Sequence, residues 1–143
     1  MGERMNGVTL TALRRITTPG GDVLHGMKRS DEGFAGFGEA YFSTIRKGHV
    51  KGWKRHNRMT LNFVVPSGQV RVCVWDERVG TQEYFLLGPD SAQGYARLTI
   101  APGLWVAFGG IAEGESLLLN IASIEHDPTE SDSLPLEAFP WIW

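Results

Sequence analysis

Apolar and polar residues alternate along several stretches of this chain, whereas no stretch repeats its apolar residues at the 3.6-residue spacing of a helix. The alternation is clearest in residues 59–65 and residues 69–75, which a Pro-Ser-Gly sequence at 66–68 separates. In the first run, the apolar side chains on one face are Met59, Leu61, Phe63 and Val65. A period of two on both sides of a short turn predicts a β-hairpin.

Other runs along the chain predict further strands. We expect them at residues 8–16, 23–27, 37–45, 83–87, 97–100, 104–108 and 116–124. Turns that contain glycine or proline separate these runs, which is typical of an antiparallel sandwich or barrel. The length of 143 residues fits a single all-β domain, residues 1–143. From about residue 134 the chain is an apolar tail, which we expect to pack back on the domain or against another subunit.

Composition argues against several classes of protein. The net charge is −2, so no overall positive field favours nucleic acid or a membrane surface. Cys73 is the sole cysteine, which excludes an intrachain disulfide and a cysteine-based zinc site. No apolar run is long enough to span a membrane, and residues 1–4 lead into no signal-peptide core. We therefore expect a soluble, cytoplasmic protein.

Positive side chains gather in one place despite the negative net charge. Around Trp53, eight consecutive residues carry five basic side chains, namely Lys51, Lys54, Arg55, His56 and Arg58. Packing gives no reason to cluster cations beside a buried strand, so the cluster predicts an anionic ligand. The alternative interpretation is a solvated basic rim without a ligand.

The basic cluster falls within a spacing that resembles the first motif of the cupin superfamily. Gly48 is followed after five residues by Lys54-Arg55-His56, after four more by Leu61, and after six more by Gly68. The second cupin motif has a counterpart at residues 102–106, where a valine, Val106, replaces the family's histidine. The resemblance covers roughly residues 37–127. It implies a cupin-type jelly-roll barrel, the double-stranded β-helix.

Within the cupins, the chain resembles the dTDP-4-dehydrorhamnose 3,5-epimerase group. Residues 46–54 parallel that group's Arg/Lys-Gly-x-x-Arg-Gly-x-His signature, and residues 76–78 parallel its Asp-x-Arg. Residues 31–34, together with Glu39, are similar to the group's early Asp-Arg-Gly-Phe and Glu. The resemblance implies a homodimer that binds a nucleotide-linked keto-sugar and needs no cofactor.

Three positions that carry catalytic groups in the family differ in this chain. Lys54 replaces the histidine base, Val106 replaces the second histidine, and residues 117–124 lack the expected tyrosine. Leu61 also replaces the glutamate of the first motif, so His56 alone remains of the four cupin metal ligands. Because the ammonium group of Lys54 would repel a cation, we expect no metal.

His56 and Lys54 are the predicted catalytic residues. Imidazole changes its protonation state near neutral pH, so His56 suits proton abstraction beside a carbonyl; a histidine hydrogen-bonded within the core is the alternative. Lys54 would stabilise an enolate, neutralise a phosphate or act as a second base, and a solvated lysine is the alternative.

Six further residues are predicted to contact the substrate. Lys51 stands where the family's arginine faces a phosphate, and Arg55 or Arg58 would supply the bidentate grip that a lysine lacks. Glu39 and Tyr41 share one face of a predicted strand and would replace the missing acid if that face lines the pocket; an outward face is the equally weighted alternative. Trp53 would stack on a sugar or a base, although ordinary core packing is the preferred interpretation of this residue.

These assignments predict an isomerase. It would act on a nucleotide-linked 4-keto-6-deoxy sugar by metal-free proton abstraction next to the ketone. Because three of the family's catalytic positions are altered, a non-catalytic cupin that binds a sugar nucleotide or another anion is the alternative. A subunit of an assembly without a small ligand is a third hypothesis.

Overall fold

The structure is a computed structural model that describes residues 5–143; the expectation about residues 1–4 lies outside the described residues. The described residues form twelve strands and two single-turn 3₁₀ helices. The strands are β1 (Val8–Ala12), β2 (Arg15–Thr18), β3 (Gly21–Leu24), β4 (Glu39–Arg46), β5 (Val50–His56), β6 (Leu61–Ser67), β7 (Val70–Asp76), β8 (Thr81–Leu87), β9 (Ala96–Ile100), β10 (Trp105–Gly110), β11 (Glu115–Ala122) and β12 (Ser131–Ser133). The 3₁₀ helices are η1 (Pro128–Glu130) and η2 (Leu136–Ala138).

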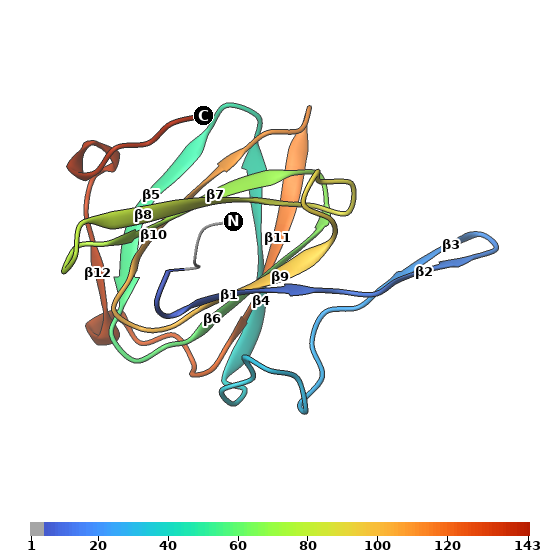
Figure 1. Cartoon of the computed structure of the whole chain (residues 1–143), viewed down its shortest axis with the longest axis horizontal. Coiled ribbons are helices and arrows are strands. Elements are labelled where there is room, and N and C mark those ends of the chain that lie inside the picture. Colours follow the sequence, from blue (N-terminus) through green and yellow to red (C-terminus); the bar gives the residue numbers. More distant parts are fainter. Residues whose placement is uncertain (1–4) are drawn as a thin grey trace.

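Ten of the strands form two five-stranded antiparallel sheets. Their orders are β1-β9-β6-β11-β4 and β12-β5-β10-β7-β8. The chain passes repeatedly from one sheet to the other, which rolls the two sheets into the barrel of Figure 1, with the β2–β3 hairpin projecting from it. The predicted all-β cupin-type jelly roll is confirmed. No helix in this described part of the chain is long and apolar enough to cross a membrane.

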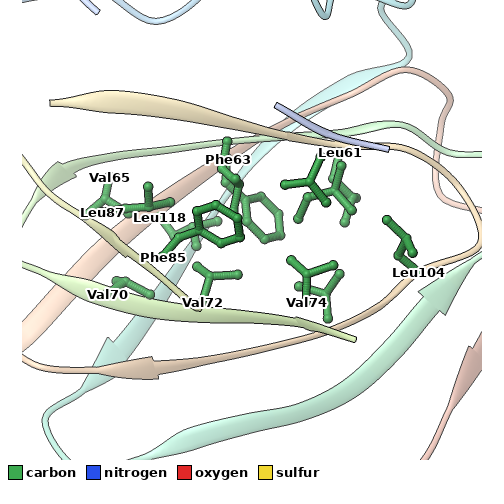
Figure 2. Close-up of a cluster of buried hydrophobic side chains, with 14 of the residues drawn as sticks. Leu61, Phe63, Val65, Val70, Val72, Val74, Phe85, Leu87, Leu104 and Leu118 are labelled. Atoms are coloured by element: carbon green, nitrogen blue, oxygen red, sulfur yellow. The ribbon is translucent and has the colours of Figure 1, made fainter. Parts of the chain in front are cut away.

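The main core fills the space between the two sheets. The valines of β7 at positions 70, 72 and 74 are fully buried, and they face the apolar side chains of β6 (Figure 2). The alternating runs on either side of residues 66–68 are the strands β6 and β7, with their apolar faces turned inward. The predicted hairpin is wrong, because β6 pairs with β9 and β11 in one sheet whereas β7 pairs with β8 and β10 in the other. The turn at 66–68 carries the chain from one sheet to the other, so the two apolar faces meet across the core. Burying each such side chain contributes roughly 1.5–3 kcal/mol.

The turn between β6 and β7 depends on its glycine. Gly68 has a φ of +86°, and a Cβ built on it would lie 2.3 Å from the side-chain oxygen of Ser116. Only glycine fits both the backbone conformation and the space. Just before it, Val65 and Pro66 stand opposite the single residue Leu118, because Val64 pairs with Leu119 and Ser67 with Leu117. This bulge accommodates a proline within a paired strand.

Two predictions near the N-terminus are wrong in extent. The expected strand at residues 8–16 is two strands, because β1 pairs with β9 only as far as Ala12 and β2 then pairs with β3. At the break, the backbone N–H of Leu13 donates to the carbonyl of Tyr95 at 3.0 Å. The expected strand at residues 23–27 lies earlier, as β3, because the hairpin turns at Gly20, whose φ is +89°.

The basic cluster forms a strand of its own, which the alternation did not predict. Strand β5 holds most of the cluster and pairs with β10 on one side and with β12 on the other. Residues 57–60 then turn the chain before β6 begins. The pattern concealed this strand because cations occupy its inner face, so it shows no alternation of apolar and polar residues.

Residues 134–143 cover the outer face of the second sheet. The ring of Phe139 lies 5.2 Å from that of Trp75, 5.4 Å from that of Trp53 and 5.7 Å from that of Trp105, between centroids. The indole N–H of Trp53 donates to the carbonyl of Leu136 at 3.0 Å. These aromatic contacts form a second apolar cluster on the back of the strand that carries the basic residues.

Candidate active site

A cavity of about 200 Å³ opens into the barrel between β4 and β5. Its apolar walls come from β6, β10 and β11, through Leu61, Phe63, Val106, Phe108 and Leu118. Its polar side chains are Tyr41, Ser43, Lys51, Lys54, His56 and Asn120. A largely apolar cavity with a few converging polar groups is the usual form of a small-molecule site. The three motif positions that depart from the cupin pattern, Lys54, Leu61 and Val106, all line it.

A bulge in β5 turns three of these polar side chains to one side. Lys54 pairs with Val106 and Lys51 pairs with Phe108, so Gly52 and Trp53 together stand opposite a single residue of β10. In a regular strand, Lys51 would face away from Lys54, because successive side chains alternate. The extra residue re-aims Lys51, and both lysines reach the cavity together with His56.

His56 is held by a buried carboxylate. Its Nδ1 lies in short contact with Oε1 of Glu130, which is only 3% exposed. The other carboxylate oxygen accepts backbone N–H groups from residues 57, 58 and 59, at 3.1, 2.9 and 3.2 Å. The short helix η1, whose N-cap Asp127 accepts from the backbone N–H of Thr129 at 2.9 Å, brings Glu130 to this position.

These hydrogen bonds keep Glu130 ionised and fix the tautomer of His56. Burial by itself would raise the pKa of the Glu130 carboxyl, but the hydrogen bonds from His56 and from the backbone of Arg58 and Met59 outweigh it and lower that pKa. An ionised carboxylate only accepts hydrogen bonds, so Nδ1 of His56 must carry the proton. In the neutral ring, Nε2 is then the free base.

The lowered pKa of Glu130 predicts an acid-dependent loss of stability. Since the folded pKa lies below the unfolded value of about 4.3, Glu130 stabilises the fold above that pH, and the contribution disappears as pH falls through the folded pKa. We expect Glu130→Gln to cost about 2 kcal/mol at pH 7 and less at pH 3. Urea unfolding of wild type and variant at both values measures this, with Glu137→Gln, on the exposed face of η2, as the control. A cost that is equal at both pH values would contradict the role of the ionised carboxylate.

Tyr41 lies in the other sheet and lines the same cavity. Its hydroxyl accepts the side-chain N–H of Asn120 at 3.0 Å, and Asn120 accepts the backbone N–H of Asn62 at 3.1 Å. Tyr41 and Asn120 are direct cross-strand partners on β4 and β11. The family's tyrosine is absent from residues 117–124, but Tyr41 brings a phenol into the cavity from the neighbouring strand.

The predicted cations divide into two groups. Arg55 pairs with Asp132 at 2.9 Å and Arg58 pairs with Asp127 at 3.0 Å, so both have carboxylate partners. Lys51 and Lys54 have no carboxylate partner among residues 5–143, and the ammonium group of Lys51 lies 5.7 Å from the ring centroid of Phe108. The unpaired cations are therefore the ones that line the cavity.

Two further predicted substrate contacts do not line this cavity. Trp53 is 1% exposed and packs beneath Phe139 on the outer side of β5, so it belongs to the second apolar cluster. The carboxylate of Glu39 accepts the backbone N–H of His126 at 2.6 Å. Within residues 5–143, no three histidine, cysteine, aspartate or glutamate side chains gather closely enough to hold a metal ion.

Sequence reasoning missed Glu130 and Asn120. Asn120 had a signal, since it is a polar residue in the middle of the most apolar predicted strand. Glu130 had none: it lies in an acidic, polar stretch that reads as solvated, and it meets His56 across 74 residues of sequence.

Comparison with known proteins identifies the family. No protein-family model matches the chain, and no curated protein matches its sequence significantly. Among solved structures, it is similar to a dTDP sugar isomerase from Desulfovibrio desulfuricans, with 36% identity and a TM-score of 0.88 over 93% of this chain and 87% of that one.

Two more distant structures share the fold. One is a mutant of the 3,4-ketoisomerase QdtA from Thermoanaerobacterium thermosaccharolyticum in complex with TDP-4-keto-6-deoxyglucose, with 19% identity and a TM-score of 0.75 over 90% of this chain and 88% of that one. The other is NovW, a 4-keto-6-deoxy sugar epimerase from Streptomyces spheroides, with 20% identity and a TM-score of 0.79 over 93% and 71%. On the strength of the first, more similar relative, the chain belongs to the dTDP-sugar isomerase family, within the cupin group that its motifs resemble.

Proposed function

We propose that this protein isomerises a dTDP-linked 4-keto-6-deoxy sugar by moving a proton at the carbons beside the ketone. The observation that most supports this proposal is the arrangement around His56. This histidine lies in the cavity with its Nδ1 held by ionised Glu130, beside two cations that have no carboxylate partner among the described residues. The similar proteins support the substrate class, since one is a dTDP sugar isomerase and another was solved with TDP-4-keto-6-deoxyglucose.

The first step is removal of a proton from the carbon next to the ketone. Nε2 of His56 takes the proton, the C–H electron pair forms a carbon–carbon double bond, and the carbonyl oxygen becomes an enolate. The ammonium group of Lys54 stabilises that negative charge within the apolar cavity. Glu130 stabilises the imidazolium that forms, because its carboxylate contacts Nδ1.

The second step returns a proton, so no oxidant or reductant is consumed. Protonation of the original carbon from the opposite side gives an epimer. When that carbon bears a hydroxyl, the hydroxyl proton passes to the enolate oxygen, and protonation of the former carbonyl carbon then moves the ketone to the neighbouring position. Tyr41, in the sheet opposite β5, is the proposed donor, and Asn120 positions its hydroxyl. Lys51 grips the phosphate next to the sugar.

Deuterium exchange tests this proposal. In deuterium oxide, the protein should introduce deuterium beside the ketone of dTDP-4-keto-6-deoxyglucose, and NMR should locate it. Deuterium retained at carbon 3 with inverted configuration indicates epimerisation, whereas deuterium at carbon 4 with a ketone at carbon 3 indicates ketoisomerisation. The proposed catalysis fails if no ring carbon exchanges faster than in buffer alone. Tight binding of the sugar nucleotide without exchange would instead support the alternative, a non-catalytic binding cupin.

We further propose a homodimer that forms through the outer face of the first sheet. Phe42 is 62% exposed there and pairs with Leu119, and the neighbouring Leu117 and Ile121 are only half-buried. The projecting β2–β3 hairpin also favours a partner, since an isolated two-stranded hairpin is marginally stable in water. Sedimentation equilibrium should give twice the monomer mass, and Phe42→Asp should shift it to the monomer. A monomeric wild type would refute the dimer.

The proposed location is the cytoplasm. Cys73 is a fully buried free thiol, and a chain without disulfides suits a reducing compartment. Fractionation of cells that express the protein would test this, and recovery outside the cytoplasmic fraction would contradict it.

A further inference from the structure

The C-terminal segment runs along β5 on the side away from β10. Strand β12 pairs with β5 from His56 to Lys54, in antiparallel register. One residue further along, the backbone N–H of Leu134 donates to the carbonyl of Trp53 at 3.0 Å. In the sheet order, β12 is the outer neighbour of β5, so these residues cover what would otherwise be an edge of the sheet. The segment therefore holds the strand that carries both predicted catalytic residues.

Beyond this ladder, the tail crosses the bulge of β5. The indole N–H of Trp53 donates to the carbonyl of Leu136 at 3.0 Å, and a Cβ built on Gly52 would lie 3.4 Å from the backbone nitrogen of Leu136. The ring of Phe139 meets that of Trp53 edge on, at 84° between the ring planes. The two residues that form the bulge are therefore the two that the tail covers.

The bulge competes with a regular pairing of β5. In the bulged register, Lys51 faces the cavity and its neighbour Val50 packs against the second apolar cluster. A slip of one residue would exchange the two, because it turns every side chain to the other face of the strand. The ammonium group of Lys51 would then lie against the apolar cluster, and burying a charge there is costly. By covering this cluster, the tail favours the register in which Lys51 enters the cavity.

We propose that Trp53 is a positioning residue for Lys51: it anchors the tail over the bulge and so keeps the Lys51 ammonium group in the cavity, where that group binds the phosphate next to the sugar. The inference rests on the proposed function, which assigns this phosphate to Lys51. It gives Trp53 an indirect role in substrate binding in place of the stacking contact, which its burial beneath Phe139 prevents.

Calorimetric titration with dTDP tests this role through a double-mutant cycle. Lys51→Gln should weaken dTDP binding about tenfold, and Trp53→Phe about fivefold, because phenylalanine keeps an aromatic ring but cannot donate to Leu136. Since Trp53 acts through Lys51, the double variant should bind within about 1.5-fold of Lys51→Gln alone. KM for the sugar nucleotide should follow the same pattern with kcat within about twofold, because a phosphate contact is equally strong in the ground state and the transition state.

Trp75→Phe is the matched control for Trp53→Phe. Trp75 also contacts Phe139, at 5.2 Å between ring centroids, but it lies on β7 and does not line the cavity. Its indole N–H has no hydrogen-bond partner among residues 5–143. This variant removes the same atoms from the same apolar cluster, so dTDP affinity should stay within about twofold of wild type.

The outcomes separate the role of Trp53 from the proposed function. If Trp53→Phe weakens dTDP binding by the same factor with and without Lys51, or no more than Trp75→Phe does, the positioning role is wrong while deuterium exchange by the wild type still supports the activity. A coupled cycle in a wild type that exchanges no deuterium would keep the positioning role and overturn the catalysis. If the wild type binds no dTDP, both fall. Phe139→Leu loosens the tail without changing β5 and should repeat the loss of affinity, so the test does not depend on the folding of Trp53→Phe.

Discussion

Replacing His56 with asparagine should lower kcat by about 10³-fold and leave dTDP affinity within a fewfold of wild type. General-base catalysis contributes a factor of roughly 10²–10⁴ to the rate. The structure describes all four histidines of the chain, and His56 is the one among them that lines the cavity. Asparagine keeps a polar side chain next to Glu130 but cannot take the proton. The measurements are kcat with the 4-keto sugar nucleotide, deuterium uptake, and calorimetric binding of dTDP.

Two further variants define what His56 does. His126→Asn changes an exposed histidine that does not line the cavity and should leave kcat unchanged. Glu130→Gln should lower kcat about 10–100-fold with KM within about threefold, because Glu130 acts through His56 and does not itself line the cavity. If His56→Asn retains more than a tenth of the wild-type kcat, His56 is not the base.

Truncating Phe139 to alanine should destabilise the fold by about 3 kcal/mol, a large share of the roughly 5–15 kcal/mol that holds a domain together. Phe139 is the centre of the second apolar cluster: its ring contacts Trp53, Trp75 and Trp105. Removing this half-buried ring uncovers the tryptophans beneath it and leaves three aromatic contacts unmade, each worth about 0.5–1.5 kcal/mol beyond burial. Urea unfolding followed by tryptophan fluorescence measures the change.

The tail supplies a matched control for Phe139. Ile142 is also a large apolar residue of residues 134–143, but it is 62% exposed, so Ile142→Ala should change stability by less than about 0.5 kcal/mol. Equal costs for the two variants would mean that the tail stabilises the domain through general apolar burial and not through the aromatic cluster around Phe139.

The alternation of apolar and polar residues predicted a strand correctly where one face of that strand is apolar. The strands β6 and β7 followed from period-two alternation, because Leu61, Phe63 and Val65 of one and the valines at 70, 72 and 74 of the other enter one core. Their pairing did not follow, because the turn at 66–68 leads from one sheet to the other and the alternation is the same whether two strands pair or face each other. The same rule missed β5, whose inner face carries Lys54 and His56. A strand that builds a polar site has no apolar face, so the pattern is weakest where the function lies.

Parts of the site were predictable from motif spacing. The frame from Gly48 to Gly68 placed Lys54, His56 and Leu61 toward the barrel interior, and all three line the cavity. Spacing did not show that Lys51 joins them, because that depends on the bulge at Gly52 and Trp53, which appears only once β5 is paired with β10. It also gave Trp53 a possible ligand role, although the tail buries that side chain.

By itself, the sequence determined the all-β class, the cupin frame and the position of the histidine, because these depend on local alternation and on residues close together in the chain. Only the tertiary structure decided which groups act on one another. Glu130 meets His56 across 74 residues, and Asn120 meets Tyr41 across 79. The carboxylates of residues 127 and 132 pair with Arg58 and Arg55, whereas the two lysines of the cavity have no carboxylate partner among the described residues. Contacts between distant segments arise from how the sheets pair and pack, so no local pattern encodes them.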